Sequence, residues 1–245
     1  MEEPKSKAKR GAKTAAAAQE DKITLLPLSE LHDFPNHPFK VRDDEAMQET
    51  AESIRQYGVL VPAIVRPRAG GGYEIIAGHR RRHGSELAGL SAMPCIVRQM
   101  DDDTATILMV DSNIQRENIL PSERAQAYKM KLEAIKRQGA RTDLTSPQVA
   151  AKFRSDDAVA KEADVSGDTV RRYIRLTELQ PELQQMVDEK KMAFTPAVEI
   201  SYLKPDEQRM LLDTISSEQA TPSLSQAQRL KKLSQSGELT DDSML

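Results

Sequence analysis

The fold is decided by the stretch YEIIAGHRRR, residues 73–82, in which a strand, a glycine and a helix follow one another. The first five residues are rich in β-forming side chains and predict a strand. Gly78 then opens a basic helix that we expect to run to about Ala88 and to end at Gly89. Such a corner directs backbone N–H groups and the positive end of a helix dipole at one place, which is typical of an anion site.

Elements on both sides of this corner predict a mixed α and β domain. We expect short strands at residues 23–27, 61–66 and 94–98, and a turn at 69–72. Asp43 or Asp44 can cap a helix that ends at Gly58. Four residues at helical spacing should form the buried face of that helix: Met47, Ala51, Ile54 and Tyr57.

The remainder of the chain is predicted to be helical. Residues 105–114 are apolar at helical spacing. Pro121 suits the first turn of a long helix that should end near Gly139, because the polar residues 141–147 follow. Short helices are then expected to about Ser216.

The composition excludes several classes of protein. Of the 245 residues, 38% are hydrophobic and 30% charged, and no apolar run approaches the ~20 residues that a membrane helix needs. The N-terminus shows no apolar segment of a signal peptide. The single cysteine, Cys95, cannot form an intrachain disulfide or a cysteine-based zinc site, and it fits a reducing cytoplasm. The net charge of −3 confines any contact with DNA to a local basic face.

Residues 156–176 carry the pattern of a helix-turn-helix. Ala160 is small where two helices must cross closely, and Asp164 lies at the tight turn, where a left-handed conformation is often needed. Ser166 is a candidate N-cap of the second helix. An ordinary helical hairpin with a solvated basic face is the alternative interpretation.

The outward face of the second helix is polar and basic. A recognition helix lays its N-terminal part in the major groove, where arginine pairs with guanine or with phosphate. The candidate DNA-binding residues are Ser166, Gly167, Asp168, Thr169, Arg171, Arg172 and Arg175.

Two polar clusters in the first half suit a phosphate ligand. Arg80 and Arg81 follow Gly78 and add bidentate guanidinium donors to the helix N-terminus. The second cluster, DSNIQREN at 111–118, crowds amide, carboxylate and guanidinium groups at a helix end and suits phosphate or Mg²⁺. Arginine runs are also common on ordinary surfaces. The sequence contains neither a Walker A motif nor GxGxxG.

Four stretches resemble the ParB family of chromosome and plasmid partition proteins. They are NHPFKVR at 36–42, SI at 53–54 with GVLVP at 58–62, YEIIAGHRR at 73–81 and NIQRE at 113–117, in the family's order and approximate spacing. The resemblance continues to about Ile215. It implies an α+β ParB/sulfiredoxin-like N-terminal domain followed by an all-α helix-turn-helix DNA-binding domain. The expected boundaries are a disordered basic tail at 1–21, the nucleotide-binding domain at 22–118, the helical domain at 119–233 and a frayed tail at 234–245.

The resemblance also implies an activity and its partners. It implies a CTP-dependent DNA clamp that loads as a dimer on double-stranded DNA at a centromere-like palindrome, parS, and works with a ParA-type ATPase. Such a protein would be cytoplasmic, associated with the nucleoid and independent of membranes. The basic N-terminal tail, with Lys5, Lys7, Lys9, Arg10 and Lys13, would dock on the ATPase, although charged runs are also common as merely solvated tails.

The family's nucleotide pocket is carried over onto matching positions of this chain. The segment from Gly58 to Pro62 would lie against the cytosine base. Gly78, Arg80 and Arg81 would hold the triphosphate, and Asn113 would approach the phosphates and Mg²⁺. The candidate nucleotide-binding residues are Gly58, Val59, Pro62, Gly78, His79, Arg80, Arg81, Ser112, Asn113 and Arg116.

The sequence departs from the family's pattern at two site positions. His79 stands where the family usually has Glu, and Ser112 stands where it usually has the Glu implicated in metal handling and CTP turnover. CTP binding is therefore expected, with slow turnover at most. Glu117 and Asp111 are the candidates to replace the missing acid.

The chain also departs from the family's pattern in length. ParB-like chains usually continue into a C-terminal dimerisation domain, whereas this one stops at Leu245 after a polar segment that resembles a linker. A trimmed chain and a natural short form are both consistent with this, and we expect a trimmed chain that lacks that domain.

Three other functions are compatible with parts of the same pattern. A nucleoid-occlusion or plasmid-replication regulator of the same family would share the fold and read another operator. A sulfiredoxin-like enzyme would need a nucleophilic cysteine beside the Gly-His-Arg segment, whereas Cys95 lies on a separate apolar strand. A metal hydrolase is disfavoured because His79 and His83 have no evident further ligand, and we expect both on the polar face of the basic helix.

Overall fold

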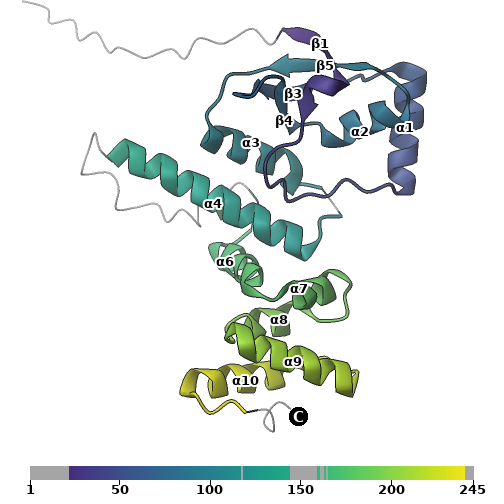
Figure 1. Ribbon diagram of the computed structural model, residues 1–245. Coiled ribbons are helices and arrows are strands. Elements are labelled where there is room, and N and C mark those ends of the chain that lie inside the picture. Colours follow the sequence, from purple (N-terminus) through teal and green to yellow (C-terminus); the bar gives the residue numbers. More distant parts are fainter. Residues whose placement is uncertain (1–21, 117, 144–158, 161–162, 164, 241–245) are drawn as a thin grey trace, which may run out of the picture.

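The computed structural model describes residues 22–116, 118–143, 159–160, 163 and 165–240. The N-terminal half forms a sheet with three helices, and the later helices are stacked beyond the long helix α4 (Figure 1). The predicted α+β domain followed by helices is confirmed. No helix within the described ranges is both long enough and apolar enough to cross a membrane. The expectations for residues 1–21 and for most of the first helix of the helix-turn-helix lie outside the described residues.

Five strands form one sheet: β1 (Ile23–Pro27), β2 (Leu31–His32), β3 (Ala63–Pro67), β4 (Tyr73–Ala77) and β5 (Ala92–Val97). Their order across the sheet is β1-β5-β3-β4-β2. β1 and β5 are antiparallel, as are β3 and β4. The pairs β3–β5 and β2–β4 are parallel, so the sheet is mixed. A 3-10 turn, Leu28–Glu30, joins β1 to β2.

Two strands differ from their predicted bounds. β3 begins at Ala63 rather than at Val61, because Arg81 binds the carbonyl groups of Val61 and Pro62 and keeps them out of the ladder. β5 begins at Ala92 rather than at Pro94, because it pairs with β1 over the whole length of β1.

Three helices belong to the sheet domain: α1 (Glu45–Tyr57), α2 (His79–Leu87) and α3 (Asp102–Ile114). Asp44 caps α1, since its side chain accepts the Met47 N–H at 2.9 Å. The predicted inward positions of α1 are buried, except that Tyr57 is 63% exposed because the helix ends there and the chain turns at Gly58. α3 begins earlier than predicted because Asp101 accepts the Thr104 N–H at 2.7 Å.

The remaining helices are α4 (Pro121–Asp143), α6 (Gly167–Arg175), α7 (Pro181–Asp188), α8 (Phe194–Ile200), α9 (Pro205–Glu218) and α10 (Leu224–Ser236), with a 3-10 turn at Leu176–Glu178. The predicted end of α4 near Gly139 is wrong, because one glycine costs a helix only about 1 kcal/mol. The frayed tail was expected from residue 234, but Ser234 is buried and donates to Glu207 at 2.6 Å.

Side chains alternate across the sheet and feed two apolar clusters. Val65, Ile75 and Cys95 belong to a cluster built from the strands. Ile76 points to the opposite face and joins Met109 of α3 and Tyr128 of α4. On one side, α4 therefore packs on α3 of the sheet domain. It also packs on α6 and α7. The helix α4 thus connects the sheet domain to the helical part.

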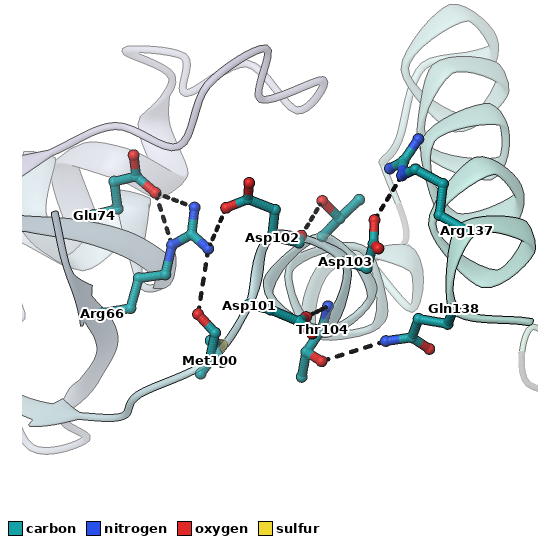
Figure 2. A network of polar contacts seen from close by, with 10 residues as sticks. Arg66, Glu74, Met100, Asp101, Asp102, Asp103, Thr104, Arg137 and Gln138 are labelled. Carbon is teal, nitrogen blue, oxygen red and sulfur yellow. Dashed lines mark hydrogen bonds and ion pairs between the residues drawn. The ribbon is translucent and has the colours of Figure 1, made fainter. Parts of the chain in front are cut away.

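A polar network adds to the apolar contact between the sheet, α3 and α4 (Figure 2). The Arg66 guanidinium binds Glu74 of β4 through Nε at 2.8 Å and Nη2 at 2.7 Å. It also pairs with Asp102 of α3 at 2.7 Å. Arg66 therefore fixes the start of α3 to the sheet.

The same turn of α3 holds the far end of α4. The Arg137 Nε donates at 2.7 Å to Asp103, whose side chain is 2% exposed. Beside this pair, the Gln138 amide donates to the Thr104 hydroxyl at 3.3 Å (Figure 2). Further along, the buried Lys131 forms an ion pair with Asp111. The seam between α3 and α4 is therefore ionic as well as apolar.

Gly78 lets β4 turn directly into α2. Its φ is +126°, and a Cβ built on it would lie 2.7 Å from the Ala63 Cβ. Only glycine satisfies both the backbone conformation and this close approach to β3.

We expect Gly78→Ala to lower the free energy of unfolding by about 1–3 kcal/mol, because it adds backbone strain and a steric clash. Gly70→Ala is the matched control, since no atom lies within 4 Å of its added Cβ. Chemical denaturation of both variants measures the difference. Equal midpoints for the two would contradict the role given to Gly78.

Candidate functional site

The corner between β4 and α2 positions two arginines toward two neighbouring cavities. Both follow Gly78, the N-cap of α2, and both are half-buried. Arg81 lines one cavity and Arg80 lines the other, and Ala46 of α1 lines both. The predicted anion corner thus opens onto two adjoining hollows.

The first cavity has a volume of about 400 Å³ and lies between α1 and the loop that follows it. Gly58 and Val59 line it, together with the exposed side chains of Leu60 and Val61. Arg81 Nη1 donates to the Val61 carbonyl at 2.8 Å and to the Pro62 carbonyl at 2.6 Å. Arg81 therefore anchors this loop against α2, a structural role that the sequence did not suggest.

The second cavity has a volume of about 320 Å³ and is rich in cations. Arg80, Arg116, Lys40 and Arg42 line it. Burial lowers the pKa of Arg116, and the positive charges of Arg80 and Arg81 lower it further. An anion placed here would relieve that repulsion, so the cavity suits phosphate groups.

The positive charge of Arg80 is only weakly neutralised by the carboxylate at the start of α1. Arg80 lies 3.8 Å from Asp44, the residue that caps α1. Because Asp44 is half-exposed, an ion pair of this kind contributes little. Arg80 is therefore available to a stronger anionic partner.

Ser112 and Asn113 lie at the end of α3 and line neither of the two cavities described above. Asn113 is 2% exposed and donates to the Met109 carbonyl at 2.8 Å. Its Oδ1 is buried without a hydrogen-bond partner in the described part of the chain. Ser112 donates to the same carbonyl at 2.9 Å. The remaining predicted residues that line neither cavity are Pro62, Gly78 and His79.

His79 does not lie on the polar face of α2, so that prediction is wrong. It is 5% exposed, and its ring stacks on His37 with a centroid distance of 3.8 Å. As the first residue of α2 it turns back beneath the loop that follows β2. Burial, and then the charges of His37 and Arg116, lower its pKa to about 3. His83 does lie at the surface and pairs with Asp43.

Asp111 and Glu117 are the two candidates to replace the missing family acid. Asp111 is paired with the buried Lys131, so it is already committed within the α3–α4 seam. Glu117 lies outside the described residues. Sequence reasoning missed Glu123, a buried acid of α4 that lines the second cavity. Its place in the first turn after Pro121 was the available signal.

The second helix of the predicted helix-turn-helix is α6. Ser166 caps it, since its hydroxyl accepts the Thr169 N–H at 3.1 Å. Val170 is fully buried, and Val159 and Ala160 of the preceding segment are buried in the same cluster. Gly167 and Asp168 form the first turn. Asp156, Asp157 and Asp164 lie outside the described residues.

The three arginines of α6 have different surroundings. Arg171 is 48% exposed and lies 3.7 Å from Asp168. Arg172 lies over the Phe194 ring at 5.3 Å and donates to Thr195 at 3.0 Å. Arg171 is thus the most outward of them.

Arg175 turns away from the outward face that the sequence predicted for it. It lies 4.1 Å from the centroid of the Tyr202 ring and donates to the Ser201 hydroxyl at 3.2 Å. The cause is that α8 ends beside the last turn of α6 and offers an aromatic ring and a carbonyl group. Arg175 therefore holds α6 against the segment after α8.

Comparison with known proteins agrees with this architecture. Residues 12–114 match the family model of the ParB N-terminal domain. The chain is 32% identical over 185 residues to the chromosome-partitioning protein Spo0J of Thermus thermophilus, covering 76% of this chain and 62% of that protein. It is 34% identical over 170 residues to the stage 0 sporulation protein J of Bacillus subtilis, covering 69% of this chain and 54% of that protein.

A solved structure shares the fold. The C-terminally truncated chromosome-partitioning protein ParB from Caulobacter crescentus, complexed to the centromeric parS site, aligns with a TM-score of 0.51 at 23% identity. The alignment covers 87% of this chain and 99% of that chain. The fold and its arginine-lined corner define the class of α+β domain found at the N-terminus of partition proteins. Residues 12–114 belong to the family of ParB N-terminal domains, and the chain is similar to chromosome-partitioning proteins over most of its length.

The buried His79 predicts a specific pH dependence of stability. Its folded pKa of about 3 lies below the ordinary 6.5, so below pH 6.5 the unfolded chain binds a proton that the folded chain does not. Stability is therefore intact above pH 6.5 and falls toward pH 3, by up to about 1.4 kcal/mol per pH unit from this residue. We expect His79→Asn to flatten this fall in denaturation curves between pH 7.5 and 4.5. His83→Asn is the control and should keep the slope of the unmodified chain.

Proposed function

We propose that this chain is a CTP-dependent DNA clamp that loads at a parS-type palindrome and serves the segregation of a chromosome or plasmid. The observation that carries the proposal is the pair of adjoining cavities at the β4–α2 corner. The match of residues 12–114 to the ParB N-terminal domain supports it, as does the parS complex of the Caulobacter protein that shares the fold. The chain spans 62% and 54% of the lengths of its Thermus and Bacillus relatives.

The two cavities suit the two ends of a nucleotide. The loop at Gly58–Val61 offers backbone groups and apolar side chains to a base, while Arg80 and Arg116 offer charge-assisted hydrogen bonds to phosphate. The choice of cytosine follows from the family resemblance. Arg81 would act on the base side, because its contacts fix the loop that the base would meet.

Mg²⁺ is proposed to accompany the triphosphate. The described residues contain no group of three or more His, Cys, Asp or Glu that could hold a metal ion. The buried, unpartnered Oδ1 of Asn113 is nevertheless an oxygen donor of the type that Mg²⁺ accepts. A single protein oxygen fits an ion whose other ligands are water and nucleotide phosphates. When bound, the ion would neutralise phosphate charge, and with Ser112 in place of an acid we expect slow turnover.

The DNA would be read by α6. Ser166 caps its N-terminal turn by accepting the Thr169 N–H, and Arg171 is its most outward arginine. A base-contacting or phosphate-contacting role for Arg171 follows from that position. Arg172 and Arg175 are proposed to support α6 from behind, since both lie over aromatic rings of neighbouring segments.

Nucleotide binding is proposed to move α3 and α4. The seam between them depends on ion pairs such as Arg137–Asp103, which Figure 2 shows, and Lys131–Asp111. Release of α4 would allow it to dock against α3 of a second copy and close a ring around DNA. A ligand shifts this balance only if it contacts one arrangement better than the other.

The nucleotide proposal predicts selective binding. We expect calorimetry to show binding of CTP in preference to ATP, GTP and UTP, and Arg80→Ala to weaken it by about tenfold or more, the cost of a charged hydrogen bond. The control is Arg55→Ala, which removes one arginine from the exposed side of α1 and should leave binding unchanged. Equal or absent binding of all four nucleotides would refute the proposal, and CTP binding that survives Arg80→Ala would place the phosphates elsewhere.

The DNA proposal predicts a specific loss. Arg171→Ala should weaken binding to a parS-like palindrome by ~1–3 kcal/mol and relax sequence preference if the side chain reads a base. Arg209→Ala on α9 is the control, because it removes an exposed positive charge from another helix. Fluorescence anisotropy with matched and scrambled palindromes measures both effects. Unchanged affinity and preference in the Arg171 variant would reject α6 as the reading helix.

The basic N-terminal segment is proposed to contact a ParA-type ATPase. A chain that lacks residues 1–20 should no longer stimulate ATP hydrolysis by that partner, because five cationic side chains are removed. The truncated chain should still bind DNA, which serves as the control. Full stimulation without the segment would exclude this role.

A further inference from the structure

Glu123 is a carboxylate placed inside an arginine-lined cavity. Its side chain belongs to the first turn of α4, it is 7% exposed, and it lines the second cavity together with Arg80 and Arg116. A negative charge in a phosphate pocket opposes the ligand. Its presence there therefore needs a physical reason.

The two carboxylate oxygens of Glu123 join two walls of the cavity. Oε1 accepts the Lys40 N–H at 3.1 Å, and Oε2 accepts the Leu120 N–H at 3.2 Å. Lys40 belongs to the loop before α1, whereas Leu120 immediately precedes α4. The carboxylate thus tethers the start of α4 to the loop that forms the other side of the cavity.

The charge of Glu123 also acts on the arginines. It raises the pKa of Arg116, whereas burial and the neighbouring Arg80 lower it. Glu123 thereby supplies part of the negative charge that a bound phosphate would otherwise supply. The same acid serves both as counter-charge and as tether.

We propose that Glu123 is the internal counter-anion of this cavity, and that phosphate groups compete with it for the arginines and loosen its hold on the loop at Lys40. The inference rests on the proposed function, because it takes the cavity to be the triphosphate site. Entry of the triphosphate weakens the tether at the first turn of α4. Occupancy of the cavity is thereby communicated to the helix that connects the sheet domain to the helical part.

The inference predicts an increase in affinity on mutation. Glu123→Gln removes the competing charge and keeps one acceptor oxygen, so tripolyphosphate and CTP should each bind about three- to tenfold more tightly. Glu52→Gln is the matched control, because it removes one exposed acid of α1 that does not line the cavity and should change neither affinity. Isothermal calorimetry at fixed ionic strength measures all three proteins. Equal or weaker binding by Glu123→Gln would overturn the inference.

Two probes separate this inference from the nucleotide proposal. If tripolyphosphate binds Glu123→Gln more tightly but CTP is not preferred over other nucleotides, the inference stands and the CTP assignment fails. If CTP is selected and Glu123→Gln binds no more tightly, the inference alone fails. If neither probe binds the unmodified chain, both fail.

A second measurement needs no variant. Hydrogen exchange of the Lys40 and Leu120 amides in the unmodified chain should become faster by severalfold when tripolyphosphate binds, because the phosphate charge repels the Glu123 carboxylate that accepts both N–H groups. Unchanged or slower exchange at both amides would overturn the inference, even if Glu123→Gln failed to fold.

Discussion

The absence of a side chain at Gly78 is the constraint on which the sheet domain depends. It allows β4 to pass within van der Waals distance of Ala63 on β3 and to turn at once into α2. The turn begins α2 beside α1, with Arg80 in one cavity and Arg81 in the other, and Ala46 of α1 lines both. The backbone conformation at Gly78 therefore places both arginines at the site.

The charges of the site are held close together at a cost to the free protein. Arg80, Arg81 and Arg116 repel one another, and partial burial denies them full solvation. The protein meets this cost with internal acceptors: backbone carbonyls for Arg81, and carboxylates at Asp44 and Glu123. A pocket organised in this way favours a ligand with several negative charges over one with a single charge.

The sequence predicted the elements that depend on local chemistry. The strand–glycine–helix corner, the Asp44 cap and the Ser166 cap all follow from residue types at fixed offsets. What it missed depends on partners distant in the chain. His79 is buried because His37 stacks on it, and Arg175 turns inward because Tyr202 lies beside it.

The residues that line the cavities also divide into those predictable from local sequence and those that depend on distant partners. Arg80 and Arg81 were predictable because they follow a recognisable corner, and the loop at Gly58–Val61 was inferred from family resemblance alone. Glu123 was not found, because an acid in the first turn of a helix is ordinary when read locally. Its role depends on the hydrogen bond from the Lys40 N–H, and Lys40 is 83 residues away in the sequence.

The ionic seam between α3 and α4 has a consequence for assembly. Both partners of each pair, such as Arg137 and Asp103, lie on one chain. Two copies that exchanged α4 would remake the same pairs between chains, with no new chemistry and little net change in contact energy. Such domain swapping is governed by protein concentration and by the segment linking the two helices. A high local concentration of chains would thus favour exchange without any change in the contacts of the seam.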